Sequence, residues 1–200
     1  MAILVVGGHS RNIGKTSVVC RMVKAFPEYR WTAIKISQHE HPEVGEGFAT
    51  VFEERDPALG SDSSRYLAAG AVRSFWVRIS DGRAAEAVDR IRWKIAHSEN
   101  VVIESNSVLN FLQPDLSLVV LDASVSDFKA SALRFVERAD AILLSGGDLT
   151  HPAWGVITPV ISTRTPILAI PRPGFWSEQA EQFIGARLAS LVPGNSSAQK

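Results

Sequence analysis

The sequence predicts an α/β fold in which a mostly parallel sheet carries helices on both faces. Three observations lead to this prediction. Short runs of β-branched and other apolar residues alternate with longer stretches of helical periodicity. The chain has 200 residues, of which 46% are hydrophobic, so it can bury a sizeable core. A glycine-rich stretch directly follows the first apolar run and precedes the first helical stretch.

The expected elements follow one another along the whole chain. Strands are expected at residues 3–6, 32–36, 74–79, 101–103, 116–121, 141–144 and 167–170. Helices are expected at residues 15–25, 62–69, 84–97, 130–138 and 178–191. Ala87, Ile91 and Ile95 lie on one face of their helix, and Gly70 follows another helix at a C-cap position. We expect one nucleotide-binding domain over residues 1–192 and a flexible polar tail over residues 193–200.

Residues 37–60 interrupt this alternation. The segment is rich in Glu, Gly, Pro and His, which makes it too polar for a core and too long for an ordinary connection. Its acidic side chains, set against the single Arg55, are Glu40, Glu43, Glu46, Glu53, Glu54 and Asp56. We expect a mobile lid that faces a substrate or partner, and the alternative is a surface excursion without a role.

The charge balance and the cysteine count restrict the class of protein. Lys and Arg number 21 and Asp and Glu number 21, so no global charge attracts nucleic acid or an anionic membrane. Cys20 has no second cysteine with which to form a disulfide, as is usual in a reducing compartment. No segment approaches the roughly 20 apolar residues that span a bilayer. We therefore expect a cytoplasmic protein that binds neither nucleic acid nor membrane.

The glycine-rich stretch has the features of a phosphate-binding loop, or P-loop. Glycines let backbone N–H groups turn toward phosphates, and the start of a helix favours an anion. A lysine can reach the β- and γ-phosphates, and the hydroxyl next to it can hold Mg²⁺. The expected nucleotide-binding residues of the loop are Gly8, His9, Ser10, Arg11, Asn12, Ile13, Gly14, Lys15, Thr16 and Ser17. These observations favour a three-layer P-loop NTPase that binds GTP or ATP with Mg²⁺.

Charged residues stand at the ends of several expected strands, where open parallel sheets bind their ligands. Glu104 follows a buried strand, so we expect Glu104 and Thr16 to share one Mg²⁺. Lys35 ends another strand and is expected to meet phosphate or a substrate carboxylate, so Lys15, Lys35 and Glu104 are the candidate catalytic residues. The alternatives are a surface glutamate and an edge lysine. Asp122 is either functional or the cap of a turn.

Metal and base recognition have weaker signals. His39 and His41 lie two residues apart, but a zinc site needs about three or four converging ligands. Contact with a substrate or partner is the preferred interpretation of these histidines. Asp148 follows a late strand and is positioned to accept hydrogen bonds from a guanine. Residues 171–173 are a second candidate wall for the base or a plain turn.

Two family resemblances follow from these motifs. The five residues between Gly8 and Gly14 resemble the phosphate loop of the dethiobiotin synthetase family. The order of motifs over about the first 105 residues resembles the molybdopterin-guanine dinucleotide biosynthesis adaptor family, MobB. The matching residues are 14–16, Ile34 and Lys35 with His39 and His41, Asp62 and Ser63 with 69–71, and 102–104. The chain departs from MobB in its longer phosphate loop, its histidine spacing and the residues 105–107 that follow Glu104.

The resemblances imply different functions. Similarity to MobB implies a slow, Mg²⁺-dependent GTP- or ATP-hydrolysing adaptor in molybdenum cofactor biosynthesis. Similarity to dethiobiotin synthetase implies an ATP-dependent ligase or kinase that acts on a small acid. A nucleotide-bound interaction module with negligible turnover is a third possibility. The expected partners are a nucleoside triphosphate, a molybdopterin guanylyltransferase or another cofactor-biosynthesis protein, and a second copy of the chain.

Overall fold

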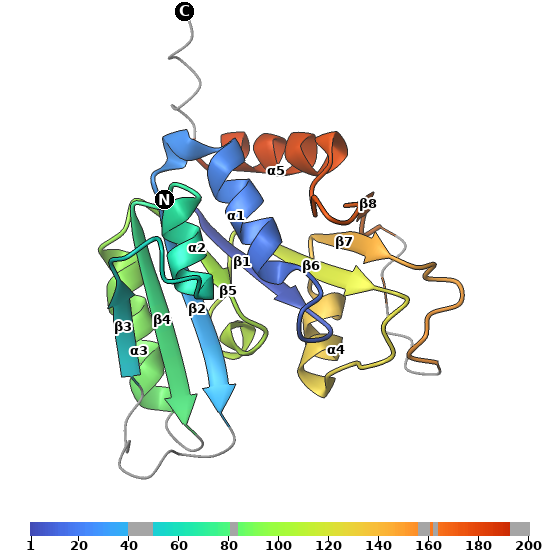
Figure 1. The fold of residues 1–200 in the computed structure, drawn as a ribbon, viewed down its shortest axis with the longest axis horizontal. Coiled ribbons are helices and arrows are strands. Elements are labelled where there is room, and N and C mark those ends of the chain that lie inside the picture. Colours follow the sequence, from blue (N-terminus) through green and yellow to red (C-terminus); the bar gives the residue numbers. More distant parts are fainter. Residues whose placement is uncertain (40–49, 81–83, 156–160, 162–163, 193–200) are drawn as a thin grey trace, which may run out of the picture.

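The computed structural model describes residues 1–39, 50–80, 84–155, 161 and 164–192 (Figure 1). The strands in these residues are β1 (Ile3–Gly8), β2 (Trp31–His39), β3 (Thr50–Glu54), β4 (Arg73–Ser80), β5 (Asn100–Glu104), β6 (Leu116–Asp122), β7 (Ala141–Gly146) and β8 (Ile167–Ala169). The α-helices are α1 (Lys15–Ala25), α2 (Asp62–Ala68), α3 (Ala84–Ala96), α4 (Ala130–Glu137) and α5 (Glu178–Leu191). Short 3₁₀ turns cover Pro27–Tyr29 and Ser107–Asn110.

The strands of the described residues form one sheet in the order β3-β4-β2-β5-β1-β6-β7-β8. All neighbouring strands run parallel except β3, which pairs antiparallel with β4. The first strand therefore lies in the middle of the sheet, between β5 and β6. Because parallel strands end at the same edge, the loop after β1 meets the residues that follow its neighbours.

Helices cover both faces of this sheet, and each face has its own apolar core. One core joins α1, α2 and α5 to the sheet, and the other joins α3 and α4 to its opposite face. The pleat of β1 alternates between them, since Leu4 and Val6 lie in the first core and Val5 in the second. The predicted fold class, an α/β sheet with helices on both faces, is confirmed.

Most of the expected elements are present, because their signals are local. The helix expected over 15–25 has these bounds, and the strand expected over 3–6 continues to Gly8. Ala87, Ile91 and Ile95 are buried, as their spacing predicts. The extent of the domain stays a prediction, and residues 193–200 lie outside the described part of the chain. None of the described helices is long and apolar enough to cross a membrane.

The prediction of a loop over residues 37–60 was wrong in two places. β2 continues through residues 37–39, and Thr50–Glu54 forms the edge strand β3. Residues 40–49, which contain His41 and part of the expected lid, lie outside the described residues. The lid stays a prediction for that part alone.

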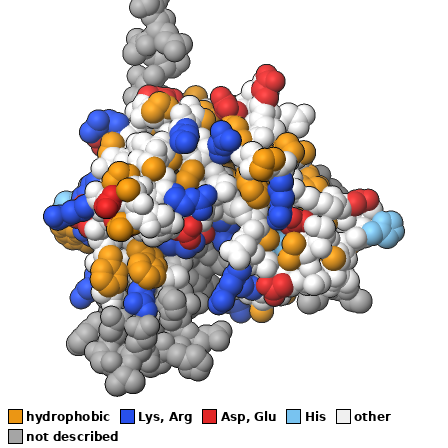
Figure 2. Space-filling model, viewed as in Figure 1, with side chains coloured by type: hydrophobic (Ala, Val, Ile, Leu, Met, Phe, Trp, Pro, Cys, Tyr) orange, Lys and Arg blue, Asp and Glu red, His pale blue; other side chains and the backbone are white. Residues whose placement is uncertain are grey.

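Side chains on the β3–β4 edge explain why a polar segment forms a strand. Phe52 stands opposite Trp76, with ring centroids 5.8 Å apart, and aromatic cross-strand pairs stabilise antiparallel sheets. Glu53 forms an ion pair with Arg73 of β4 at 2.9 Å. Phe52 is 43% exposed, and Figure 2 shows hydrophobic side chains on this side of the molecule. The two apolar residues of this edge strand, Val51 and Phe52, are adjacent, so the strand lacks the alternation by which a sequence reveals a strand.

The close packing of β1 on α4 leads to a prediction about stability. A Cβ atom at Gly7 would lie 2.6 to 2.7 Å from ring atoms of the buried Phe135. Because overpacking of this kind costs about 1–3 kcal/mol, we expect Gly7→Ala to lower the free energy of unfolding by that amount in urea titrations. Gly174→Ala is the matched control, since the nearest atom to its Cβ would be 3.8 Å away. Equal stability of the two variants would contradict the packing described here.

Candidate phosphate-binding site

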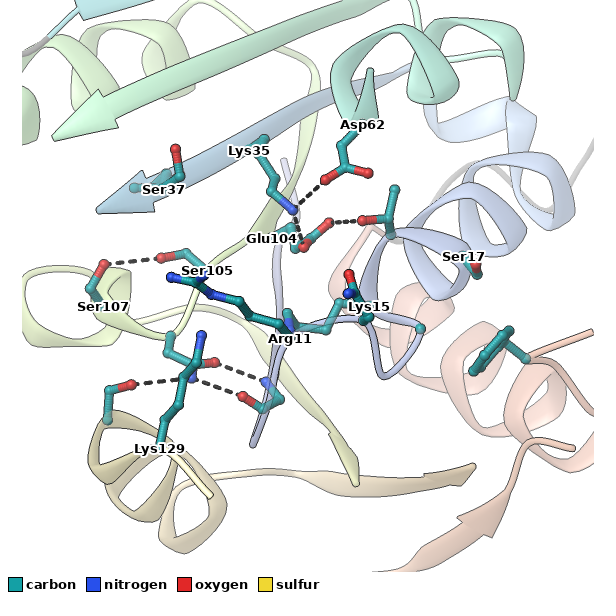
Figure 3. A pocket seen from close by; sticks show the side chains of 18 of the residues that line it. Arg11, Lys15, Ser17, Lys35, Ser37, Asp62, Glu104, Ser105, Ser107 and Lys129 are labelled. Carbon is teal, nitrogen blue, oxygen red and sulfur yellow. Dashed lines mark hydrogen bonds and ion pairs between the residues drawn. The ribbon is translucent and has the colours of Figure 1, made fainter. Parts of the chain in front are cut away.

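A cavity of about 980 Å³ opens where β1, β2 and β5 end (Figure 3). The residues that line it come from the loop before α1, from the first turns of α1, α2 and α4, from the ends of these strands and the segment after β5, and from the segment before α5. They are Gly8, Arg11, Asn12, Gly14, Lys15, Thr16, Ser17, Lys35, Ile36, Ser37, Asp62, Arg65, Glu104, Ser105, Asn106, Ser107, Lys129, Ala130, Ser131 and Phe175. The sheet topology thus brings together the expected loop, Lys35 and Glu104.

The loop from β1 to α1 depends on two residues with left-handed backbone. Asn12 has φ 57°, and Gly14, the N-cap of α1, has φ 104°. Glycine adopts this conformation without strain, and it also lets a ring approach closely. A Cβ at Gly14 would lie 2.2 Å from the Phe175 ring. Gly14 therefore combines a turn and a contact that no other residue allows.

Lys15 is the first residue of α1 and lies over the loop. Its Nζ donates a hydrogen bond of 2.5 Å to the main-chain oxygen of Ser10. Burial lowers the pKa of Lys15 from 10.5 to about 8; the charges of Lys35 and Lys129 also lower it, and that of Glu104 opposes them. A buried ammonium with so few compensating charges is stabilised by any anion that enters the cavity.

Asn106 fixes the start of the loop from a neighbouring strand. Its Oδ1 accepts a hydrogen bond of 2.8 Å from Gly8 N, and its Nδ2 donates one of 2.9 Å to Gly8 O. The amide thus satisfies both main-chain groups of a residue that lines the cavity. The sequence did not predict this role of Asn106, although residues 105–107 depart from the MobB pattern. An amide side chain two residues after the carboxylate that ends a strand is the feature that could have indicated it.

A buried carboxylate connects four elements at the base of the cavity. Glu104 of β5 is 3% exposed and accepts a hydrogen bond of 2.7 Å from Thr16 Oγ1 of α1. Tyr66 Oη of α2 donates to the same oxygen, Oε2. Lys35 Nζ of β2 forms ion pairs with Glu104 Oε1 and, at 2.7 Å, with Asp62 Oδ2. Glu104 is therefore not a surface glutamate. Lys35 is not an isolated lysine at the edge of the sheet, because it pairs with Glu104 and Asp62.

The electrostatics of this network favour the charged forms of Lys35 and Asp62. Burial alone lowers the pKa of Lys35, but the charges and hydrogen bonds of Glu104 and Asp62 outweigh it and raise that pKa. Burial favours the neutral form of Asp62, yet its bond to Lys35 lowers its pKa. Burial and the neighbouring Glu104 raise the pKa of Tyr66 well above 10. Tyr66 therefore remains a hydrogen-bond donor.

The donor set at Thr16 and Glu104 suits a hard cation such as Mg²⁺. Thr16 lines the cavity and uses its single hydroxyl proton toward Glu104, which leaves its oxygen lone pairs as acceptors. The described residues contain no cluster of three His, Cys, Asp or Glu side chains that could hold a metal ion. A cation here would thus need phosphate oxygens and water to complete its shell. The side chain of His39 and all of His41 lie outside the described residues.

Four expected loop and base ligands do not line the cavity. Ile13 is buried, and Ser10 Oγ donates a hydrogen bond of 2.6 Å to Asp127 Oδ2. Asp148 is exposed and accepts hydrogen bonds from the backbone and side chain of Thr150 at 2.9 and 2.6 Å. The fourth is His9, which is buried. For these residues, nucleotide contact stays a prediction without support from the cavity geometry.

His9 is a buried packing residue. Its Nε2 accepts a hydrogen bond of 3.1 Å from Asp122 N, so Nδ1 carries the proton and donates to Asp127 O at 2.8 Å. The ring stacks on Phe128 at 5.2 Å and lies 4.9 Å from the Trp154 ring. A glycine-rich motif does not reveal which way its side chains point. The His9 side chain packs against Phe128 and Trp154 and does not line the cavity.

Asp122 reaches the cavity only through a chain of contacts. It accepts a hydrogen bond of 3.0 Å from Ser124 N, as the turn-cap interpretation predicts, and its Oδ2 pairs with Arg172 Nη2 at 2.5 Å. Burial favours the neutral acid, but the Ser124 bonds and the Arg172 charge lower the pKa of Asp122. Arg172 lies 5.4 Å from the Phe175 ring, which covers Gly14. The Pro-Arg-Pro segment thus supports a wall of the cavity.

Comparison with known proteins yields similarity of fold alone. No family model matches the chain, and no curated protein matches it. The "apo" form of LpxK from Aquifex aeolicus, solved in complex with ATP, is 16% identical with a TM-score of 0.49 over 84% of this chain and 53% of that chain. HypB from Helicobacter pylori, solved with nickel, is 14% identical with a TM-score of 0.49 over 94% of this chain and 85% of its own. The chain thus spans about half the length of LpxK, and the likeness to MobB stays a prediction.

The environment of His9 predicts a pH dependence of stability. Burial lowers the pKa of His9 below 6.5, so the unfolded chain binds a proton that the folded chain rejects as the pH falls. The stability from this group is complete above about pH 6.5 and is lost as the pH falls through the folded pKa. In urea titrations at pH 7.5 and 5.5 we expect His9→Gln to lose less stability than the parent chain. One proton limits the difference to about 1.4 kcal/mol per pH unit.

His151→Gln controls for the removal of a histidine, because His151 is exposed. It should keep the pH profile of the parent chain. A His9→Gln variant with that same profile would show that His9 is not the group responsible.

Proposed function

We propose that this cavity binds a Mg²⁺–nucleoside triphosphate and slowly hydrolyses it. One observation carries the proposal. Lys15 and Thr16 open a helix directly after a glycine-rich loop, and the Thr16 hydroxyl contacts the buried Glu104 of the adjacent strand at 2.7 Å. A lysine that reaches phosphate and a hydroxyl that can hold Mg²⁺, both at the start of a helix, are what a P-loop requires, and Glu104 adds a second hard oxygen from the end of β5.

The loop residues have separate parts in this proposal. The backbone N–H groups at the start of α1 would bind the phosphates, and Lys15 would leave the Ser10 oxygen to contact the β- and γ-phosphates. Asn106 holds Gly8 from the side, so the loop keeps its shape without a ligand. Pre-organised donors of this kind stabilise the charge that develops during phosphoryl transfer.

Thr16 and Glu104 would hold Mg²⁺, Thr16 by a direct bond and Glu104 directly or through water. The bound ion would neutralise phosphate charge and draw electron density from the γ-phosphate. Lys35 already neutralises Glu104 and lines the cavity, so it is placed to meet phosphate charge. Tyr66, which donates to Glu104, would keep the carboxylate in one orientation.

The nucleotide and the pathway are the finer part of the proposal. Following the MobB resemblance, we propose that the chain is a GTP- or ATP-hydrolysing adaptor in molybdenum cofactor biosynthesis and acts with a molybdopterin guanylyltransferase or a similar protein. The support is the motif order of the first 105 residues, of which Lys35, Asp62 and Glu104 meet in one network. Phe175 and Arg172, more than Asp148, are the side chains near the helix start that would contact a base.

A second candidate function is transfer of the γ-phosphate to a small acid. It is favoured by the extent of the cavity, which reaches from the phosphate loop to Ser37 on β2 and to Ser107 after β5. Turnover measured without any added substrate separates the functions. Basal hydrolysis favours the adaptor, dependence on an added acid favours the transferase, and tight binding without turnover indicates an interaction module.

The position of Lys15 predicts a loss of nucleotide affinity. Each charge-assisted hydrogen bond to phosphate contributes about 1.5–3 kcal/mol, so Lys15→Ala should weaken Mg²⁺–nucleotide binding roughly 10- to 100-fold in calorimetry. Lys24→Ala is the control, because Lys24 is an exposed residue of the same helix outside the cavity lining. If both variants bind like the parent, with unchanged circular dichroism, Lys15 is not a phosphate ligand.

The Thr16–Glu104 pair predicts a change in magnesium dependence. Glu104→Gln keeps the shape of the side chain but removes the charge that attracts Mg²⁺ and pairs with Lys35. Turnover should need about tenfold or more Mg²⁺ for half-maximal rate, since one charged ligand interaction contributes about 1.5–3 kcal/mol. Nucleotide binding without Mg²⁺ should change less.

Glu137→Gln, at an exposed residue of α4 outside the cavity lining, controls for the loss of a carboxylate. Identical magnesium titrations for Glu104→Gln and Glu137→Gln would remove Glu104 from the metal site.

A further inference from the structure

The cavity is larger than the phosphate loop alone accounts for. Its volume, about 980 Å³, is at the upper end of the range of roughly 300–1,000 Å³ found for ligand sites. It extends from Arg11, at the tip of the loop, to Ser37, Ser105, Ser107 and Lys129 outside the loop, and we call these five residues the anion compartment. In Figure 3 the Arg11 and Lys129 side chains extend on the side of the cavity where Ser105 and Ser107 lie.

The carboxylates that line the cavity are neutralised at its other side. Glu104 pairs with Lys35, and Asp62 pairs with Lys35 at 2.7 Å and with Arg65 at 3.4 Å. Among the described residues, Asp62 and Glu104 are the acidic side chains of the lining. The negative charge of the cavity is thus concentrated around Lys35, away from the anion compartment.

The anion compartment therefore adds positive charge to that of Lys15. Lys129 is near enough to Lys15 for its charge to lower the pKa of Lys15. Arg11, at the tip of the phosphate loop, is exposed and lines the same cavity. On the face shown in Figure 2, Lys and Arg side chains are prominent across the middle of the molecule. Two cations beyond the phosphate-reaching lysine attract a second anion.

Hydroxyl groups complete the compartment with further hydrogen-bond donors. Ser37 Oγ accepts a hydrogen bond of 2.8 Å from Trp76 Nε1, so its own proton can be donated to another group. Ser105 Oγ and Ser107 Oγ lie 3.2 Å apart and share one hydrogen bond, which leaves one of their two protons for a ligand. The compartment thus offers donors, and a complementary ligand must be rich in acceptors.

We propose that the anion compartment binds a small co-substrate or effector carrying carboxylate or phosphate groups, next to the γ-phosphate of the nucleotide. This inference rests on the proposed nucleotide function, because the two ligands share one cavity. The apolar side chains of the lining are Ile36, Ala130 and Phe175. Phe175 lies at the opposite end, over Gly14.

The experiment compares anion binding with nucleotide binding in the full chain. The nucleotide complex is first formed with Mg²⁺ and a non-hydrolysable triphosphate analogue. It is then titrated by calorimetry with aliphatic dicarboxylates from succinate to suberate, with glycerol 3-phosphate and ribose 5-phosphate, and with neutral succinamide. The test variant is Lys129→Gln, which leaves the phosphate loop unchanged. The control variant, Lys24→Gln, loses the same charge at an exposed residue outside the cavity lining.

We expect at least one anion, and not succinamide, to bind the parent complex and the control variant. The test variant should bind that anion at least tenfold more weakly while its affinity for the nucleotide changes less than threefold. If the dicarboxylates bind more tightly than the phosphate esters, the ligand is a carboxylic acid. If the phosphate esters bind more tightly, the ligand is a phosphate ester. Absence of binding by every anion, or equal binding by both variants, overturns the proposal.

Two other outcomes are distinct. If the test variant loses nucleotide affinity as strongly as anion affinity, Lys129 belongs to the triphosphate site and the compartment is refuted. If the parent chain binds no nucleotide, the proposed function fails. Anion binding by the parent chain, tested against the same two variants without nucleotide, then decides the compartment separately.

Discussion

The buried carboxylate of Glu104 is the interaction on which the candidate site depends. It is 3% exposed and would be costly to bury alone, yet donors from three other elements reach it. Thr16 connects it to the helix after the phosphate loop, Lys35 to the neighbouring strand, and Tyr66 to α2. Removing any one donor leaves a buried charge less well compensated. The positions of α1, α2 and β2 around the cavity are therefore coupled through one side chain.

A second set of contacts fixes the loop itself. Asn106 holds Gly8, the Asp122 backbone holds His9, and Phe175 covers Gly14. These contacts come from the segment after β5, from the end of β6 and from the segment after β8. The loop is thus shaped from outside, and its own sequence supplies mainly the glycines and the reactive side chains.

The sequence alone predicted nearly all of the helices and strands, since their signals are periodic and local. It also predicted that Thr16, Lys35 and Glu104 belong to one site, because strand ends in a parallel sheet meet. It missed β3, whose single aromatic pair with β4 makes no alternating pattern. It missed Asn106, Tyr66 and Phe175, whose roles depend on partners far along the chain. It listed His9 among the nucleotide-binding residues, but it did not reveal that the His9 side chain is buried among aromatic rings.

The long sequence separations around the phosphate loop have a consequence for synthesis on the ribosome. The partner of Gly8, Asn106, comes 98 residues later in the chain. The ring that covers Gly14 belongs to Phe175, which follows the last described strand. A nascent chain that ends before these partners has the whole glycine-rich motif but not the walls that shape it. Because non-local contacts form late and cost loop-closure entropy, the glycine-rich loop cannot take its folded shape before these later partners are synthesised. The loop, though it precedes its partners in the sequence, is thus among the last parts of the described structure to form.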